Sequence, residues 1–441
     1  MKTYRIHTSL AVILTGIGIH AQTMTLSQCL DEGLQNNYQI RLSRISEEVA
    51  ANNDTWANAG GMTTLDLTGG YDGSMYDRNM TDRQTGDVSS TRGVVDHTLS
   101  AQIAANWTIF NGFKVQSTLD RLQELHRQGE TRTRMAVEDF VADIASGYYN
   151  YVRQQLRRQN LNYAVALSRE RLRIVQERYA IGSNSRLDLQ QAQVDFNSDS
   201  ARSMKQNEAV RSALIELNQL MSREELTEFF AAADTSIDLL PVQSYQTLEE
   251  LMLQSNLDLL QAESNSRISE LDLKAARARN YPYLRLHASY GFTHNIYGSG
   301  TSSTRDNWGP GFGATVGINL LDGKHKTETR NAKLNIESAR LNRQNLELAL
   351  RSDLTDLWQS YENNLQLVDL EQQNLLTAKE NHAIACERYM IGDLSGLQMR
   401  EAQKSLLDAE ESLLQAQYDT KICEISLFQI SGQILQYLEG E

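Results

Sequence analysis

Two stretches decide the fold: residues 177–193 read ERYAIGSNSRLDLQQAQ, and residues 387–403 read ERYMIGDLSGLQMREAQ. At an offset of 210 residues they agree at nine of seventeen positions, so the chain contains an internal repeat. Each copy ends a helical pattern at a Gly and resumes helical spacing a few residues later. Because Gly supplies the positive φ that closes a helix, each copy predicts a hairpin tip, near 181–186 and 391–396.

The composition permits very long helices and argues against one class of partner. Only three Pro residues occur in 441, at Pro241, Pro282 and Pro310. Since Pro breaks helix interiors, long stretches on both sides of this region can stay helical without interruption. The formal net charge of -14 argues against a nucleic-acid partner, which usually requires a basic face.

The N-terminus has the pattern of a secretory signal. Lys2 and Arg5 precede an apolar core, and a small residue, Ala21, follows it. We therefore predict a signal peptide over 1–21 and a mature chain that leaves the cytoplasm.

Residues that could bind a metal or take part in catalysis are scattered along the sequence rather than grouped. The three cysteines, Cys29, Cys386 and Cys423, lie far apart on helical patterns and are expected to be free packed thiols. The eight His show no metal-ligand spacing, and no nucleophile or phosphate-loop motif is present. We expect no catalytic residue, no cofactor and no metal site, and hence not an enzyme.

Each half of the chain is expected to begin with a helix that runs into strands. The first helix is expected over 25–52, with Thr25 as its cap, and its counterpart begins at Thr247. Period-two patterns then predict strands at about 65–72 and 98–110 and, in the second half, at about 283–296 and 309–321. Polar loops are expected between the paired strands, over 75–96 and 297–307.

The strands allow two interpretations. About ten residues per tilted strand matches a membrane, and aromatic residues near the strand ends suit its two interfaces. The alternative is a water-soluble antiparallel sheet with one wet face. The chain has no apolar run of membrane-helix length after the signal, so any membrane-spanning part must consist of strands.

Long helices follow the strands. Each second strand ends at a break, Asn111-Gly112 or Asp322-Gly323, and helical spacing follows over about 114–180 and 325–390. In the first of these, apolar residues recur at alternating steps of four and three, the seam of a coiled coil: Val137, Val141, Ile144, Tyr148 and Tyr151 or Val152. Such a helix is about 100 Å long. Return helices are expected over 187–221 and 397–438.

The chain is thus predicted to be mainly α with membrane β, built from two structural repeats. The first covers 22–221 and the second 247–441, with a joint at 222–246 that lacks periodicity. Four strands cannot close a barrel, and an open edge in lipid leaves backbone groups unpaired at several kcal/mol each. If these strands span a membrane, the chain must oligomerise, with eight strands from two copies or twelve from three.

The element order, twice over, and the segment ARARNYPYLRLHASYGF at 276–292 resemble the TolC-like outer membrane efflux proteins across the mature chain. The resemblance implies a homotrimer with a twelve-stranded barrel in outer membrane lipid and an α-helical barrel, or tunnel, across the periplasm. It also implies a passive exit duct for tripartite efflux or type I secretion, with a periplasmic adaptor and an inner-membrane pump or exporter as partners. The competing class is a soluble periplasmic coiled-coil scaffold or binding protein.

The resemblance also suggests residues that close the periplasmic mouth. Asp188 and Tyr389 match positions that form polar contacts between hairpins in the family. Alternatively, Asp188 caps the returning helix and Tyr389 is a packed seam residue. Leu394 replaces an Arg of the family pattern and Gln398 an acidic residue that narrows the pore, whereas Glu401 keeps a charge nearby.

Six tip residues are candidates for adaptor contact, three in each copy: Ile181, Gly182, Ser183, Ile391, Gly392 and Asp393. Gly permits close backbone approach, and an apolar residue beside it offers a contact. The alternative, in which each Gly serves only the turn, does not explain an Ile beside it in both copies.

Overall fold

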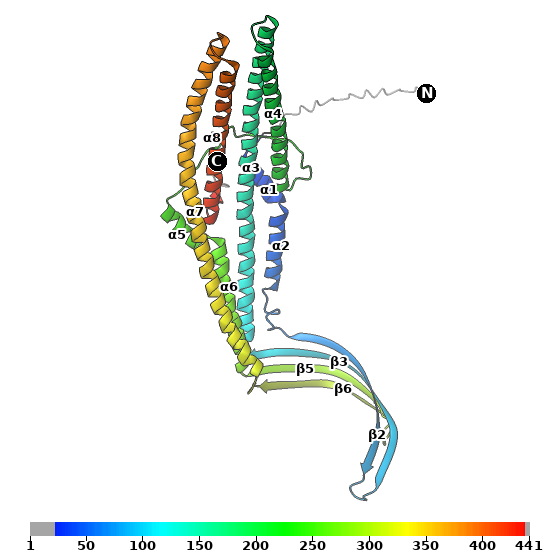
Figure 1. The fold of residues 1–441 in the computed structure, drawn as a ribbon. Coiled ribbons are helices and arrows are strands. Elements are labelled where there is room, and N and C mark those ends of the chain that lie inside the picture. The colour runs from blue at the N-terminus through cyan, green and yellow to red at the C-terminus, as the bar shows by residue number, and fades with distance from the viewer. Residues whose placement is uncertain (1–22, 437–441) are drawn as a thin grey trace, which may run out of the picture. The chain divides into compact units, whose positions relative to one another are not determined.

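The computed structural model describes residues 23–436, and the predicted signal peptide lies outside them (Figure 1). The chain divides into two compact units. One contains residues 39–137 and 249–353, and the other contains residues 23–38, 138–248 and 354–436 of the described chain. The helices α3 and α7 contribute residues to both units.

The first predicted helix is two helices, α1 (Leu26–Asn36) and α2 (Tyr38–Asn53). Thr25 caps α1 as expected, in a capping box with Gln28. The expectation of one continuous helix is wrong because Asn37 has ψ of 123°, an extended value that ends the ladder.

The second half repeats this interruption. The helices α5 (Tyr245–Ser255) and α6 (Leu257–Arg277) are separated by Asn256, whose side chain caps α6 at Leu259. The predicted start at Thr247 is two residues late, because the hydroxyl of Ser244 accepts from the Thr247 backbone and thereby caps the first turn. A short 3-10 turn, η1 (Ala278–Asn280), leads into the sheet.

Four antiparallel strands form one sheet in the order β2-β3-β5-β6. They are β2 (Thr64–Thr81), β3 (Val88–Asn111), β5 (Tyr283–Ile296) and β6 (Thr304–Gly317). In Figure 1 the β2–β3 pair continues beyond the end of β5 and β6. The sheet therefore has two outer edges, on β2 and β6, and a projecting two-stranded ribbon.

The predicted loop at 75–96 is wrong, because all but residues 82–87 belong to β2 and β3. Its Asp, Ser, Thr and Gly residues indicated a loop, but in this exposed ribbon both faces meet solvent and polar side chains fit a strand. The predicted loop at 297–307 is also too long, since β6 begins at Thr304, and β6 ends at Gly317 rather than at 321.

The register confirms the period-two pattern and extends it across the sheet. One face carries apolar side chains on every strand, with partners such as Leu67↔Ile103 and Ile103↔Tyr290. Most of these side chains are exposed: Leu65, Leu67, Tyr71, Leu99, Ile103, Trp107, Leu286, Tyr290, Phe292, Trp308, Phe312 and Val316. The opposite face carries polar residues such as Gln102 and Ser289. An exposed apolar face this continuous requires another apolar surface to cover it.

The two helical hairpins lie largely in the other unit, although α3 and α7 extend into the unit with the sheet. The helices α3 (Lys114–Ala180) and α4 (Arg186–Leu220) form the first, and α7 (Gly323–Met390) and α8 (Gly396–Ile430) form the second (Figure 1). The expectation that the return helix continues without a break to 438 is wrong, because α8 ends at Ile430, where Gly432 takes a φ of 72°, and residue 438 itself lies outside the described residues. None of the helices in residues 23–436 combines the length and apolar character needed to cross a membrane.

The core of this unit includes the predicted seam of α3. Val141, Ile144, Tyr148 and Tyr151 are fully buried there. The Tyr148 hydroxyl donates to the carbonyl of Met24 in β1 (Thr23–Met24), which pairs in parallel with β4 (Ala231–Ala232). The seam thereby anchors both the start of the described chain and the middle segment.

Candidate functional site

The hairpin tips are two copies of the same helix-ending turn. Gly182 has φ of 78° and Gly392 has φ of 83°. In the first tip the Ser183 amide donates to the Arg178 carbonyl and the Gly182 amide to that of Tyr179, and the second tip repeats both bonds. This is the Schellman arrangement, in which a left-handed Gly satisfies the last carbonyls of a helix. The predicted hairpin tips are confirmed.

Each return helix begins with a capping box, but the two boxes differ in charge. Ser185 and Asp188 cap α4, whereas Ser395 and Gln398 cap α8. Hydrogen bonds from Ser185 hold the pKa of Asp188 below its usual value. Asp188 therefore has the capping role that the sequence left open, and Gln398 plays the same part in the second hairpin.

The apolar tip residues are among the most exposed in the chain. Ile181 is 81% exposed and Ile391 is 80% exposed. Neither Gly182 nor Gly392 has another atom within 4 Å of the place a side chain would occupy. The tips thus present an apolar side chain beside accessible backbone, while Asp393 pairs with Arg388 of its own turn. Whether they contact an adaptor stays a prediction.

An arginine joins the two tips. The Arg178 guanidinium donates to the carbonyls of Tyr389 and Met390, at 3.2 and 3.3 Å. These are the last carbonyls of α7, and a cation at a helix C-terminus also interacts favourably with the helix dipole. Arg178 also lies over the Tyr389 ring, with its Cζ 5.2 Å from the ring centroid.

Tyr389 is a buried seam residue whose hydroxyl lacks a hydrogen-bond partner among residues 23–436. Burial raises its pKa, and the nearby Asp188 carboxylate raises it further while Arg178 lowers it. The predicted bond between Asp188 and Tyr389 is not formed within this chain, although the two groups lie close enough to interact electrostatically. Their role in closure stays a prediction.

The other positions that the sequence connected with closure, Glu401 and Leu394, lie in different surroundings. Glu401 is exposed on the first turns of α8. Leu394, at the position of a family Arg, packs against the apolar cluster of Ala385, Tyr389, Met399 and Ala402. A cation that joins the hairpins lies six residues further along the chain, at Arg400.

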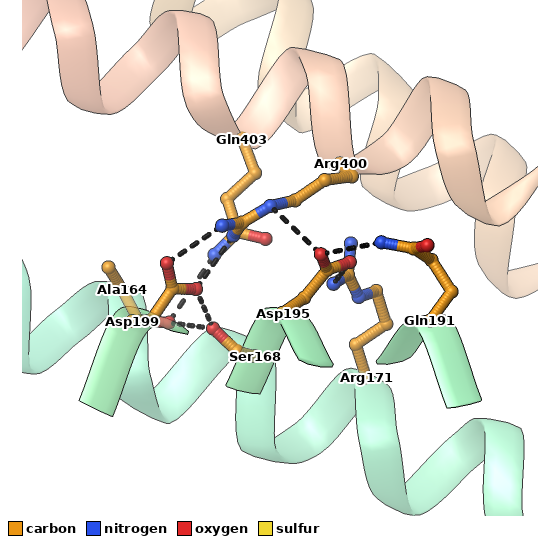
Figure 2. Close-up of polar contacts among 8 residues, drawn as sticks. All are labelled: Ala164, Ser168, Arg171, Gln191, Asp195, Asp199, Arg400 and Gln403. Carbon is orange, nitrogen blue, oxygen red and sulfur yellow. Dashed lines mark hydrogen bonds and ion pairs between the residues drawn. The ribbon is translucent and has the colours of Figure 1, made fainter. Parts of the chain in front are cut away.

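Arg400 forms a largely buried polar link between the two hairpins (Figure 2). From α8 it donates to both carboxylate oxygens of Asp199 on α4, at 2.6 and 2.8 Å. Ser168 of α3 also donates to Asp199, which is only 1% exposed. Because the hydrogen bonds to Asp199 outweigh desolvation, the pKa of Arg400 is raised. A two-pronged bond of this kind fixes both distance and orientation.

A second carboxylate extends the link toward the tips. Asp195, one turn before Asp199, pairs with buried Arg171 of α3 and accepts from Gln191 at 3.0 Å. Arg400 lies 3.9 Å from Asp195 and so contacts both carboxylates. We call Arg171, Asp195, Asp199 and Arg400 the inter-hairpin cluster. Two cations and two anions make it neutral, which burial requires.

The cluster is not fully satisfied. Nε and Nη1 of Arg171 are buried without a partner among residues 23–436, and burial lowers the pKa of Arg171. Gln403 adds a hydrogen bond from α8 to the Ala164 carbonyl of α3, at 3.3 Å. Polar bonds therefore join the hairpins here, in contrast to an apolar coiled-coil seam. Some of the buried donors in this contact have no acceptor within the described part of the chain.

Sequence reasoning missed this cluster, although a signal was present. Positions 192, 195, 199, 203, 206 and 210 of α4 follow a coiled-coil seam and are all buried. Four of the six are polar: Asp195, Asp199, Ser203 and Gln206. Charged residues at buried seam positions require partners of opposite charge. Arg400 of the other hairpin is such a partner.

The part of the chain that the structure describes holds no group of three or more His, Cys, Asp or Glu arranged to bind a metal. All three cysteines are free, with Cys29 buried and the other two half-buried, which confirms the prediction of packed thiols. A sheet with one exposed apolar face, together with paired hairpins that end in matched tips, defines the class of outer membrane channel subunits.

The comparisons identify the family. A model of the outer membrane efflux protein family matches residues 29–223 and 248–433, so the chain belongs to that family. It is 20% identical over 421 residues to the outer membrane protein TolC of Vibrio cholerae, covering 93% of this chain and 91% of that protein. It is 21% identical over 420 residues to the probable outer membrane lipoprotein SilC of Salmonella typhimurium, covering 92% and 85%.

A solved structure shares the fold. The Campylobacter jejuni CmeC outer membrane channel matches with a TM-score of 0.74 at 19% identity, over 92% of this chain and 85% of that one. The chain is therefore an outer membrane exit duct of an efflux system, in a family of channels rather than enzymes. The first match extends two residues past the first predicted repeat, which ends at 221, and the second match lies within the second predicted repeat.

Proposed function

We propose that three copies of this chain form the duct, and that it works passively with a periplasmic adaptor and an inner-membrane pump or exporter. The observation that carries the trimer is the open four-stranded sheet with an exposed apolar face. Its outer edges on β2 and β6 would leave backbone groups unpaired in lipid, at several kcal/mol each. Edge pairing between three copies gives twelve strands and a passage.

The helices of the same unit supply a second surface for neighbouring copies. Leu334, Leu341 and Leu348 of α7 recur every seven residues and are 54 to 68% exposed. Leu42, Ile45 and Val49 form a comparable exposed stripe on α2. A seven-residue apolar repeat is the pattern of a coiled-coil interface, so these stripes suit packing between copies.

The tips are the part we assign to the adaptor. Each presents an exposed Ile beside a Gly with open space around it: Ile181 with Gly182, and Ile391 with Gly392. Helical tips of a partner could approach such backbone closely and cover the apolar side chain. Ser183 and Asp393 would border this contact.

We assign closure of the periplasmic mouth to the links between hairpins. The inter-hairpin cluster holds α8 against α4 within one chain, and Arg178 holds the tip of α7. Asp188, Tyr389 and Glu401 are proposed to contribute contacts that depend on the state of the hairpins or on neighbouring copies. One neutral bond supplies only about 1 kcal/mol, so closure needs several together.

The trimer is tested by the mass of the purified, detergent-extracted protein. The protein should be found in the membrane fraction. Sedimentation of the purified particle, corrected for bound detergent, should give the mass of three chains. A water-soluble monomer would overturn the proposal and favour the periplasmic scaffold.

The adaptor assignment is tested by Ile181→Ser with Ile391→Ser, a change that keeps both turns. Export should fall while trimer abundance stays normal, because only the exposed tip contact is lost. Phe229→Ser is the matched control, since Phe229 is 51% exposed but lies in the middle segment. Normal export in the double variant would overturn the assignment.

A further inference from the structure

One contact on α7 is used by neither the fold nor the proposed duct. His382 and Cys386 lie one helical turn apart, and Nε2 of His382 is 3.6 Å from the Cys386 sulfur. His382 is 6% exposed and Cys386 is half-buried. Imidazole nitrogen and thiolate sulfur are both favoured ligands of d¹⁰ metal ions.

The spacing matches a shared metal ion. Zinc binds sulfur at about 2.3 Å and imidazole nitrogen at about 2.0–2.1 Å. With a tetrahedral angle between these bonds, the two ligand atoms lie about 3.6 Å apart. The separation of 3.6 Å between Nε2 of His382 and the Cys386 sulfur equals this value, so the two atoms are already spaced to share one ion.

A third soft donor, on the returning helix, belongs to the apolar cluster beside Cys386. Cys386 packs against the apolar cluster that contains Met399 of α8, which is 7% exposed. A thioether suits Cu⁺ but is a poor ligand for Zn²⁺. We propose that His382 and Cys386 form a binding site for a d¹⁰ metal ion, and that Met399 completes it when the ion is Cu⁺.

The protonation states fit this assignment in part. Burial lowers the pKa of His382, so its ring is neutral and keeps a lone pair for a metal. Burial raises the pKa of the Cys386 thiol, so the ion must displace the thiol proton, which passes to solvent. The ion then joins two turns of α7 and, through Met399, the return helix of the same hairpin.

The chain supplies its own control. Cys423 is also half-buried, but its contact is the Asn364 side-chain amide, at 3.6 Å, rather than an imidazole. An amide nitrogen has no lone pair to offer a metal. Cys423 thus matches Cys386 in exposure and lacks the second ligand.

The first test measures metal uptake by the purified full-length protein in detergent, with Zn²⁺ and Cu⁺ each offered against a chromophoric chelator. Wild type and Cys423→Ser should take up one equivalent per chain at this site. Cys386→Ser and His382→Gln should bind at least about tenfold more weakly. Met399→Leu should weaken Cu⁺ binding alone, and unchanged Cu⁺ binding would remove the thioether from the site.

The second test needs no variant and so does not depend on folding of a mutant. Alkylation of each cysteine is followed by mass spectrometry with and without saturating metal. Cys386 should react about tenfold more slowly with metal bound, and Cys423 at an unchanged rate. Unprotected Cys386, or equal uptake by wild type and Cys386→Ser, would overturn the proposal.

Discussion

The two hairpin tips share the residues Glu-Arg-Tyr before an Ile-Gly pair, yet the same arginine acts differently in each. Arg178 of the first hairpin donates to the last carbonyls of the second hairpin, whereas Arg388 pairs with Asp393 in its own turn. A repeated sequence therefore repeats the turn but not the contacts around it. At the tips, the arginine contact between hairpins therefore runs in one direction only, from the first hairpin to the second.

The seams differ in the same way. At the repeat offset of 210, Asp195 corresponds to Ser405 and Asp199 to Ala409, so at these two seam positions only the first hairpin has buried carboxylates. The second hairpin supplies Arg400, the cation that contacts both of these carboxylates. The two copies have thus diverged, because two identical hairpins would lack this pairing between carboxylates of one hairpin and an arginine of the other.

The largest expected effect separates Arg400 from Arg388, both in the second hairpin. Arg400→Met leaves Asp199 buried without its charged partner, and losing one partner of a buried pair costs about 3–5 kcal/mol. Arg388→Met breaks an exposed pair and should cost under about 1 kcal/mol. Denaturant unfolding of the purified protein, followed by helical circular dichroism, compares them, and equal losses would show that Asp199 is not dependent on Arg400.

Replacing both partners sharpens this result. Asp199→Leu with Arg400→Met removes both charges, and well-packed apolar substitutes for a buried ion pair are often neutral in stability. The double variant should therefore regain most of the free energy of unfolding lost by Arg400→Met. A loss equal to the sum of the two single losses would mean that the charges act independently.

The two tip arginines give a smaller difference. Arg178→Ala removes the bonds to the end of α7 and should loosen that end by about 1 kcal/mol, a roughly fivefold rise in local hydrogen exchange. Arg388→Ala should leave exchange in the first hairpin unchanged. Mass-resolved exchange over 385–392 and 175–182 makes the comparison, and equal effects of both variants would contradict the one-way link.

Two glycines near the second tip test the turn itself. Gly392→Ala should cost about 1 kcal/mol because an L side chain is strained at a φ of 83°. Gly396 begins α8, has open space and lacks a positive φ, so Gly396→Ala should be neutral or stabilising by up to about 1 kcal/mol. Thermal unfolding distinguishes the two, and destabilisation by both would place the strain elsewhere in the turn.

The smallest effect concerns acid, and it distinguishes the two capping boxes. The pKa of Asp188 is lowered in the folded chain, so its stabilisation is present above the unfolded pKa of 3.8 and is lost as pH falls through the lowered value. The box with Gln398 has no such titration. Hydrogen exchange corrected for intrinsic rates should increase at 186–190 below that pH and not at 396–400, and Asp188→Asn should abolish the difference.

The sequence predicted those parts of the fold that depend on local patterns. Gly182 and Gly392 fixed the tips, the seam through Ile144 and Tyr148 fixed the long helix, and alternation fixed the apolar face of the sheet. The breaks at Asn37 and Asn256 were missed because Asn is tolerated within helices and its side-chain bonds are not visible in a periodicity.

The inter-hairpin cluster could not be predicted in full, because it joins residues from α3, α4 and α8. Asp199 meets Arg400 across 201 positions of sequence, a pairing that no local pattern specifies. The family pattern directed attention to Leu394 instead, where an apolar residue now packs. The one local signal was the placement of Asp195 and Asp199 at seam positions, which indicated that these carboxylates need a cationic partner.

Planar-bilayer conductance of the wild-type protein and Arg400→Met tests the central claim, that this is an exit duct whose mouth is held shut by links between hairpins. The wild type should insert and show a small conductance, and Arg400→Met should show a larger one while remaining a trimer. A protein that never inserts would contradict the duct. Equal conductance of the two proteins would contradict closure by the inter-hairpin cluster.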